Sequence, residues 1–257
     1  MIDSSVEHGH IHAPLILVHG WGFSPQTLAP LASALTDQPQ HVHVAELPGY
    51  GTRYNEPSPA HIHEIASLLI QTYPNPSHWL GWSLGGLIAL YIAQRWPERV
   101  TKLVLFGTTP RFTVAPDWPH GTEPHVLENF AAHLAVDRTG TLQRFAHLQL
   151  ADNPSEKRHF SQLAAYVANE QVANLTTLQS GLGLLRTVDL HSTIGQITVP
   201  TLLIHGEADR VVNIEAGEMT AQRMPNARLI RLPACGHVAF MTEKAHCVAA
   251  ITEFLRE

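Results

Sequence analysis

The chain has 257 residues, about the length of one large α/β domain or of one domain with an insertion, and its formal net charge is −6. A hydrophobic content of 44% excludes a disordered chain, and the acidic balance excludes the broad basic surface of a nucleic-acid-binding protein. Two cysteines exclude a disulfide framework and fit a reducing compartment.

Short apolar runs alternate with longer helical patterns, which is typical of a mostly parallel sheet flanked by helices. The predicted strands cover residues 14–18, 41–45, 78–80, 102–106, 201–205 and 228–232. The predicted helices between and after them cover residues 27–35, 62–73, 84–96, 216–224 and 245–255. The helix over 84–96 is apolar at nearly every position and is followed by Pro97, so it is expected to be a buried crossover helix.

One segment, residues 111–190, breaks this alternation. It begins with a proline-rich stretch and continues with helical patterns over 126–134 and 141–150, and it contains no convincing strand. Because the strands on either side belong to one sheet, we expect a single α/β core formed by residues 1–110 and 191–257. Residues 111–190 are then an inserted helical cap, or lid.

The motif Gly81-Trp82-Ser83-Leu84-Gly85 matches G-x-S-x-G between a predicted strand and a predicted helix. A serine in this position sits on a sharp, strained turn, and the glycines let the neighbouring backbone pass without Cβ clashes. Its hydroxyl projects at the N-terminus of a helix, where negative charge is favoured. The pattern predicts Ser83 as a nucleophile, with a glycine-rich turn of no chemical role as the alternative.

A serine nucleophile needs a base, and the base needs an orienting acid. In this strand–turn–helix geometry the chain order is Ser, then Asp or Glu, then His, each following a strand. Asp209 follows the fifth predicted strand and His237 follows the sixth, so both belong to the sheet edge that carries Ser83. We therefore expect His237 to take the Ser83 proton and Asp209 to orient His237, with Glu207 as a competing acid.

The tetrahedral intermediate of such a reaction needs two preorganised N–H donors, called the oxyanion hole. One is expected to be the backbone N–H of Leu84, directly after the nucleophile. The other is expected from the loop after the first strand, His19-Gly20-Trp21-Gly22, with Trp21 N–H as the preferred donor. The Trp21 ring can form an apolar wall at the same time.

These features together resemble the α/β-hydrolase family over nearly the whole chain. Finer motifs are similar to those of one group within it, the pimeloyl-acyl-carrier-protein methyl ester esterases of biotin synthesis. These motifs lie at residues 19–22, 80–86, 117–119, 144–145, 148–149 and 181–190. The resemblance implies a serine carboxylesterase that hydrolyses a pimeloyl methyl ester through an acyl-enzyme, releasing methanol while the acyl chain stays on its carrier.

The resemblance also implies two sets of binding residues. The substrate slot comprises Trp21, Leu84, Phe145, Ala146, His147, Leu148, Gln149 and His237. Basic residues of the cap are expected to hold the acidic acyl carrier protein: Arg138, Arg144, Lys157 and Arg158. Of these, Arg144 matches the family well, whereas Lys157 replaces an arginine, which keeps the charge but loses bidentate geometry.

Three His-x-His pairs occur without a cysteine or carboxylate cluster to complete a metal site, namely His10/His12, His41/His43 and His61/His63. We therefore expect no metal and no cofactor. The first apolar run is too short for a signal peptide or a membrane span, so we expect a cytoplasmic protein that does not bind a membrane. We also expect a monomer, and the acidic balance argues against binding to nucleic acid. Two alternatives stay open: a broad-specificity carboxylesterase for short-chain esters, and a non-catalytic binding protein on a hydrolase fold.

Overall fold

The computed structural model describes residues 13–36, 41–169 and 172–257, so the His10/His12 pair lies outside it. Its centre is a six-stranded sheet in the order β2-β1-β3-β4-β5-β6, and all five neighbouring pairs are parallel, as expected. The strands are β1 (Leu15–Val18), β2 (Val42–Ala45), β3 (Ser77–Trp82), β4 (Val100–Phe106), β5 (Thr201–Gly206) and β6 (Ala227–Leu232).

The central strands are apolar on both faces because helices cover both faces of the sheet. Every residue of β1, β3 and β5 is buried. The prediction was wrong in length for β3, which has six residues, not three. Its last two residues, Gly81 and Trp82, belong to the turn motif by sequence but pair with Leu105 and Phe106 of β4.

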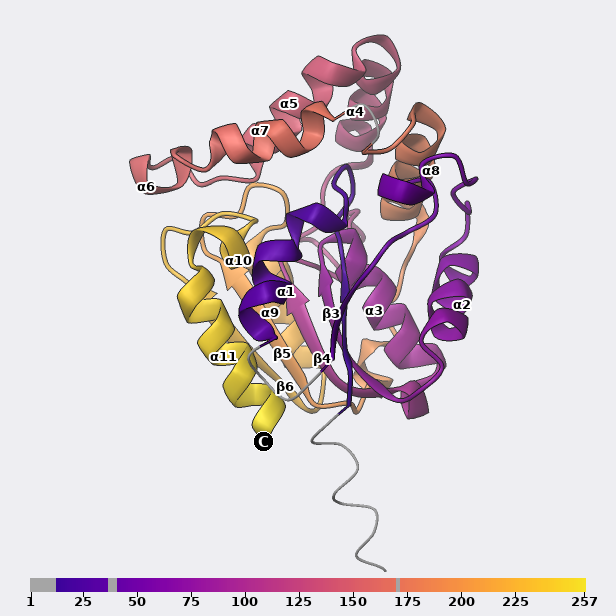
Figure 1. Cartoon of the computed structure of the whole chain (residues 1–257), viewed down its shortest axis with the longest axis vertical. Coiled ribbons are helices and arrows are strands. Elements are labelled where there is room, and N and C mark those ends of the chain that lie inside the picture. The colour runs from indigo at the N-terminus through magenta and orange to yellow at the C-terminus, as the bar shows by residue number, and fades with distance from the viewer. Residues whose placement is uncertain (1–12, 37–40, 170–171) are drawn as a thin grey trace, which may run out of the picture.

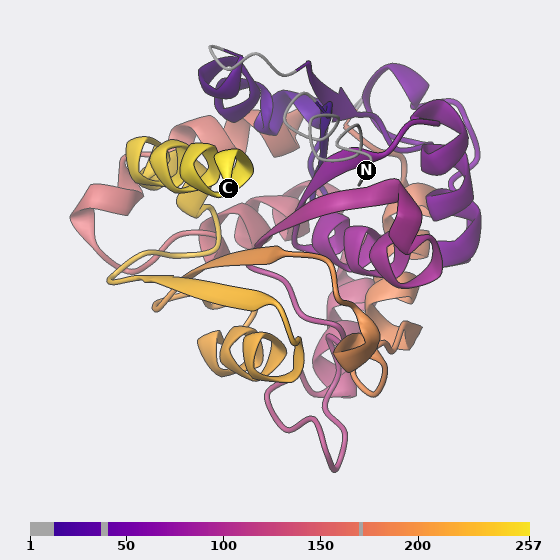
Figure 2. The same ribbon diagram turned by 90° about the horizontal axis from the view of Figure 1, so that it is seen from below.

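Helices lie on both sides of the sheet (Figure 2). One face carries α1 (Ala29–Leu35) and α11 (Lys244–Arg256), and the other carries α2 (Ile62–Thr72), α3 (Leu84–Arg95) and α9 (Ile214–Arg223). The shorter elements are α10 (Ala239–Thr242) and the 3₁₀ turns η1 (Pro25–Thr27), η2 (Gly51–Arg53), η3 (Pro97–Arg99) and η4 (Ile194–Gln196). Within the described ranges, no helix combines the length and the apolar character needed to cross a membrane.

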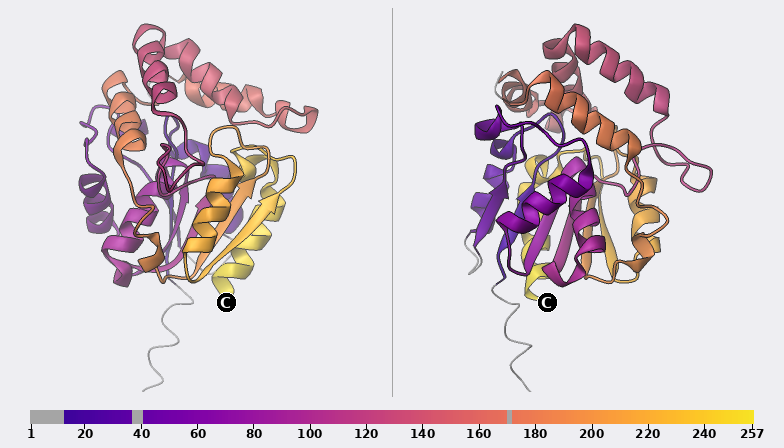
Figure 3. Two further views of the ribbon diagram at one scale, coloured as in Figure 1. Left: turned by 180° about the vertical axis from the view of Figure 1, so that it is seen from behind. Right: turned by 90° about the vertical axis from the view of Figure 1, so that its right-hand side faces the viewer.

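Residues 111–190, here called the inserted segment, leave the sheet after β4 and return before β5. They form α4 (Pro124–Val136), α5 (Arg138–Leu148), α6 (Pro154–Lys157), α7 (Phe160–Ala168) and α8 (Leu175–Thr187). These helices lie over the edge of the sheet at which the strands end (Figures 1 and 3). The described residues of the segment add no strand to the six-stranded sheet.

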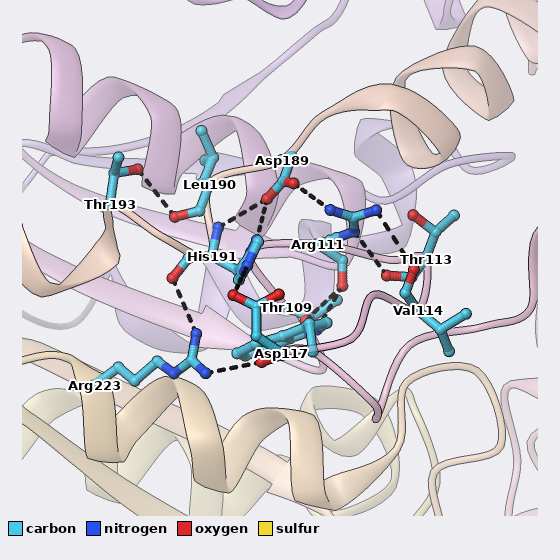
Figure 4. A network of polar contacts seen from close by, with 11 residues as sticks. Thr109, Arg111, Thr113, Val114, Asp117, Asp189, Leu190, His191, Thr193 and Arg223 are labelled. Carbon is cyan, nitrogen blue, oxygen red and sulfur yellow. Dashed lines mark hydrogen bonds and ion pairs between the residues drawn. The ribbon is translucent and has the colours of Figure 1, made fainter.

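A polar network joins the two ends of the inserted segment (Figure 4). His191 lies between two carboxylates: its Nε2 is 2.8 Å from Asp117 Oδ2, and its Nδ1 contacts Asp189 Oδ1. Arg111 pairs with Asp189, and Arg223 of α9 donates to the backbone oxygens of Asp117 (2.9 Å) and His191 (3.3 Å). The segment is therefore tied to the core where it leaves and where it returns.

This network predicts a pH-dependent stability. Burial lowers the pKa of His191, but Asp189 and Asp117 outweigh it, so the pKa lies above the ordinary 6.5. A raised folded-state pKa gives stability that is fully present below about pH 6.5 and is lost as the pH rises through the folded-state value. We expect the free energy of unfolding to fall less steeply over this range in H191Q than in the wild type.

Urea unfolding of both proteins at several pH values measures this difference. His205, whose pKa is also raised, is present in both proteins and cancels in the comparison. Parallel pH profiles of the two proteins would contradict the proposed protonation of His191.

Candidate active site

Ser83 occupies the turn between β3 and α3 with φ 55° and ψ −118°. Residues other than glycine rarely adopt a positive φ. Its N–H donates to Phe106 O of β4 at 2.9 Å, which anchors the turn to the sheet. The flanking glycines are required by space: a Cβ on Gly81 would lie 2.4 Å from Gly85 O, and a Cβ on Gly85 would lie 2.1 Å from Val18 O. Close backbone packing thus holds Ser83 in this strained conformation.

Asp209 and His237 meet at the same edge of the sheet. His237 Nδ1 lies 2.7 Å from Asp209 Oδ2, and both side chains are fully buried. The other carboxylate oxygen of Asp209 accepts the N–H groups of Val211 (2.8 Å) and Val212 (2.9 Å). Glu207, the competing acid, instead pairs with Arg231 on the surface. His237 therefore has one carboxylate partner, Asp209, and the backbone N–H groups of Val211 and Val212 fix the position of that carboxylate.

A second imidazole also contacts Asp209. Nε2 of His205, at the end of β5, lies 3.3 Å from Asp209 Oδ2 and 2.9 Å from Val212 O. Burial would raise the pKa of Asp209, but His237 and His205 outweigh it and hold the pKa well below its usual range. Asp209 is thus held as a carboxylate. His205 was not predicted as a site residue, although its place at a strand end, four residues before Asp209, is a signal that the sequence contains.

The ring of His237 leaves one nitrogen unused. Nε2 is buried and has no hydrogen-bond partner among the described residues, and no hydrogen bond joins it to Ser83. Unpaired buried nitrogens are costly, so such an atom in a native structure marks a place for a further partner. Hydrogen bonds between a nucleophile and its base are often long in a free enzyme and tighten only with substrate.

A cavity of about 120 Å³ adjoins Ser83. Its walls are mostly apolar and come from Trp21, Phe112, Thr122, Val126, Leu127, Phe130, Phe145, Leu148, Leu182, Leu185, Arg210 and Val211. The rings of Trp21, Phe130 and Phe145 pack edge to face, with centroids 5.0 to 5.7 Å apart. A larger and more open groove of about 570 Å³ lies next to α2 and the end of α8. Ser83, Asp209 and His237 do not line this groove.

Three of the expected substrate residues line this cavity with Ser83: Trp21, Phe145 and Leu148. The Trp21 ring is held in place because its Nε1 donates to Leu178 O of α8 at 2.8 Å. The core loop after β1 and the inserted segment therefore build one wall together.

The other five expected residues do not line the cavity, namely Leu84, Ala146, His147, Gln149 and His237. Successive residues of a helix point in directions about 100° apart, so a run such as 145–149 cannot face one cavity. Accordingly, Ala146 and Gln149 are fully buried, and His147 is exposed. Leu84 is packed in the core as the first residue of α3.

The cavity residues of α4 and α8 were not predicted from the sequence. Val126, Leu127 and Phe130 of α4 are spaced so that they share one helix face, as are Leu182 and Leu185 of α8. Their spacing was the signal that could have identified these two faces. The remaining residues that were missed come from loops: Phe112, Thr122, Arg210 and Val211.

The four basic residues expected to hold a carrier differ in the exposure and the partners of their side chains. Arg144 and Lys157 have more than half of their side chains exposed, and each pairs with an aspartate, at 3.6 and 2.7 Å. Arg158 is exposed beside His159. Arg138 is half-buried, and its guanidinium donates to Ala173 O at 2.6 Å. Three of the four cations are therefore accessible on the inserted segment.

Residues 13–244 match the family model of the alpha/beta hydrolase fold. The chain belongs to the α/β-hydrolase family. This hydrolase is 33% identical over 247 residues to the pimeloyl-[acyl-carrier protein] methyl ester esterase of Vibrio parahaemolyticus. The match covers 95% of this chain and 94% of that protein. It is 34% identical over 248 residues to the protein of the same name from Aromatoleum aromaticum, with 94% and 98% covered.

Solved structures of an esterase and of a bromoperoxidase are similar in fold to this chain. An esterase from Exiguobacterium antarcticum superposes with a TM-score of 0.85 at 24% identity, covering 95% of this chain and 92% of that one. A bromoperoxidase from Bacillus anthracis gives 0.87 at 21% identity, covering 96% and 92%. The α/β-hydrolase fold expected from the sequence is confirmed.

The crowding around the turn predicts a stability difference between two glycines of this hydrolase. A methyl group on Gly85 would overlap backbone atoms, which cannot move away cheaply, whereas Gly183 in α8 has nothing within 4 Å. We expect G85A to lower the free energy of unfolding by about 1–3 kcal/mol or more. G183A, the matched control, should keep or raise it by up to about 1 kcal/mol, because alanine favours a helix.

Urea unfolding of the two variants and the wild type measures these values. Equal stability of G85A and the wild type would contradict the close packing of the turn against β1.

Proposed function

We propose that this hydrolase cleaves the methyl ester of pimeloyl-acyl-carrier protein, giving methanol and the free carboxylate, in biotin synthesis. That it is a carboxylic ester hydrolase follows from its family and its named relatives. One observation carries the proposed reaction: Ser83 adjoins an apolar cavity at the sheet edge that holds the buried His237–Asp209 pair. The acyl group and carrier are supported by the names of relatives that match nearly the whole chain.

In the proposed mechanism, Ser83 Oγ attacks the carbonyl carbon of the methyl ester while His237 Nε2 takes its proton. The tetrahedral intermediate collapses, and His237 returns the proton to the leaving methoxide, so methanol departs and an acyl-enzyme remains. Water then attacks the acyl-enzyme with His237 as base, which frees the carboxylate and restores Ser83. Asp209 holds the Nδ1 proton of His237 and stabilises its imidazolium form throughout.

We propose Leu84 N–H and Trp21 N–H as the oxyanion hole. Leu84 is the first residue of α3, where backbone N–H groups have no partner within the helix and the helix dipole favours negative charge. Trp21 follows β1, which pairs with β3 through Val18 and Gly81, so its loop lies beside the nucleophile turn. These donors would stabilise negative charge on the carbonyl oxygen where it develops.

The inserted segment acts as a cap in this proposal. It supplies most of the apolar wall, against which the methylene chain of the acyl group would pack without a polar partner. The thioester end would point outward to the carrier, an acidic protein that Arg144, Lys157 and Arg158 would attract by charge. Arg138 would take part only by giving up its bond to Ala173 O.

Mass spectrometry of the carrier-bound ester tests this function directly. We expect the wild-type protein to remove one methylene mass from pimeloyl-carrier methyl ester and to cleave small p-nitrophenyl esters. S83A should lose both activities by at least about 10³-fold, because the nucleophile is missing, with an unchanged unfolding curve. Cleavage of small esters with no mass loss from the carrier substrate would instead favour a broad-specificity carboxylesterase, and full activity of S83A would exclude the mechanism.

Charge reversal tests the contact with the carrier. R144E is expected to lower kcat/KM for the carrier-bound ester by about tenfold, more at low salt, and to spare p-nitrophenyl esters. R228E reverses an exposed arginine of β6, away from the inserted segment, and serves as the matched control. Equal losses on both substrates in R144E, or equal losses in R144E and R228E, would argue against docking at Arg144.

A further inference from the structure

The loop after β6, residues 233–238, carries the proposed base, and its backbone is bonded to the inserted segment. His237 N–H donates to Gln149 O at 2.7 Å. Gly236 N–H donates to both carboxylate oxygens of Glu156, at 3.0 and 3.1 Å. The consecutive N–H groups of Gly236 and His237 therefore donate to acceptors of the inserted segment and not to acceptors of the core.

The same loop is strained and closely packed. Ala234 has φ 54°, and its oxygen accepts a hydrogen bond from Asn153 Nδ2 at 2.8 Å. A Cβ on Gly236 would lie 2.6 Å from Gln149 O and 2.6 Å from Ala151 N. The core also holds this loop, through Trp82 Nε1 to His237 O (3.2 Å) and Ala208 N–H to Cys235 O (2.9 Å), so its conformation depends on contacts with both the core and the segment from 149 to 156.

Glu156 is the charged group at the centre of this contact. It is 3% exposed, and its carboxylate accepts from Ala151 N–H, Gly236 N–H and the hydroxyl of Thr242 (2.9 Å). No cationic side chain of the described residues lies within ion-pair distance of it. A buried carboxylate without a cation is costly unless hydrogen bonds replace its water, so all three donors must stay in place together.

We propose that Glu156 is a positioning residue, which holds the His237 loop so that the imidazole faces Ser83. The proposal rests on the proposed role of His237 as the base. Glu156 acts through Gly236, the residue before His237, and does not touch the reacting atoms. Its loss would let the loop move by a fraction of an ångström to an ångström, and misplacement on this scale can lower the rate of the chemical step up to about 10²-fold.

The variant E156Q tests this role. Glutamine keeps the shape but replaces one acceptor oxygen by an NH₂ group, which faces the N–H donor of Gly236 in either orientation of the amide. With p-nitrophenyl ester substrate we expect kcat to fall about tenfold or more while KM changes less than about twofold. The control is E98Q, the same change at an exposed glutamate of η3, which should keep wild-type kinetics.

Two further readouts separate positioning from a purely structural role. The low-field proton resonance of His237 Nδ1 should shift or broaden in E156Q but not in E98Q, at a temperature where both are folded by circular dichroism. E156D, which keeps the carboxylate, should recover part of the lost kcat. A lowered melting temperature with unchanged kcat and an unchanged resonance would overturn the proposal.

If E156Q does not fold, T242V carries the test. It removes one donor and leaves the carboxylate, so we expect a smaller fall in kcat, about threefold, at constant KM. Wild-type kcat in T242V would then overturn the proposal. Failure of the proposed function is a different result, because wild type and E98Q would then also be inactive, or S83A would be as active as they are.

Discussion

Parallel strand pairing is the constraint on which the arrangement of this site depends. In a sheet with all strands parallel, every carboxyl end lies at one edge, and the loops after β3, β5 and β6 meet there. Ser83, Asp209 and His237 are 126 and 28 residues apart in sequence, as 209 − 83 and 237 − 209, yet each needs only to follow its own strand. The buried Asp209–His237 bond is possible because β5 and β6 are neighbours in register.

The inserted segment and the edge of the sheet form the cavity around Ser83 together. The core alone provides Ser83, Asp209 and His237 and the Trp21 ring, and α4, α5 and α8 close the apolar cavity around Ser83. The polar network around His191 ties the segment at its base, whereas the contacts of Glu156 tie it at the far end beside the His237 loop. The helices over the site are therefore held to the core at these two places and also through the bond from Trp21 Nε1 to Leu178 O of α8.

Much of this could be predicted from the sequence, because the deciding signals are local. Strand runs and the glycine pattern predicted the fold, and the order of Ser83, Asp209 and His237 after successive strands predicted which loops would meet. The cavity walls depend on helix rotation and on packing between segments, so a contiguous run such as 145–149 was a poor guide. Glu156 stands in a polar stretch typical of an exposed surface, and only the folded chain shows that its carboxylate is buried against Gly236.

The bonds from Gln149 and Glu156 to the loop of His237 bear on how such enzymes can be recombined. A cap of similar length transplanted from another hydrolase must place a carbonyl oxygen and a carboxylate where Gln149 O and Glu156 lie, because two backbone N–H groups of that loop otherwise lose their acceptors. Residues 149–156 and 233–238 therefore form one exchangeable module, although about 80 residues separate them in the chain. A chimera that respects this module would place its crossover points outside both stretches.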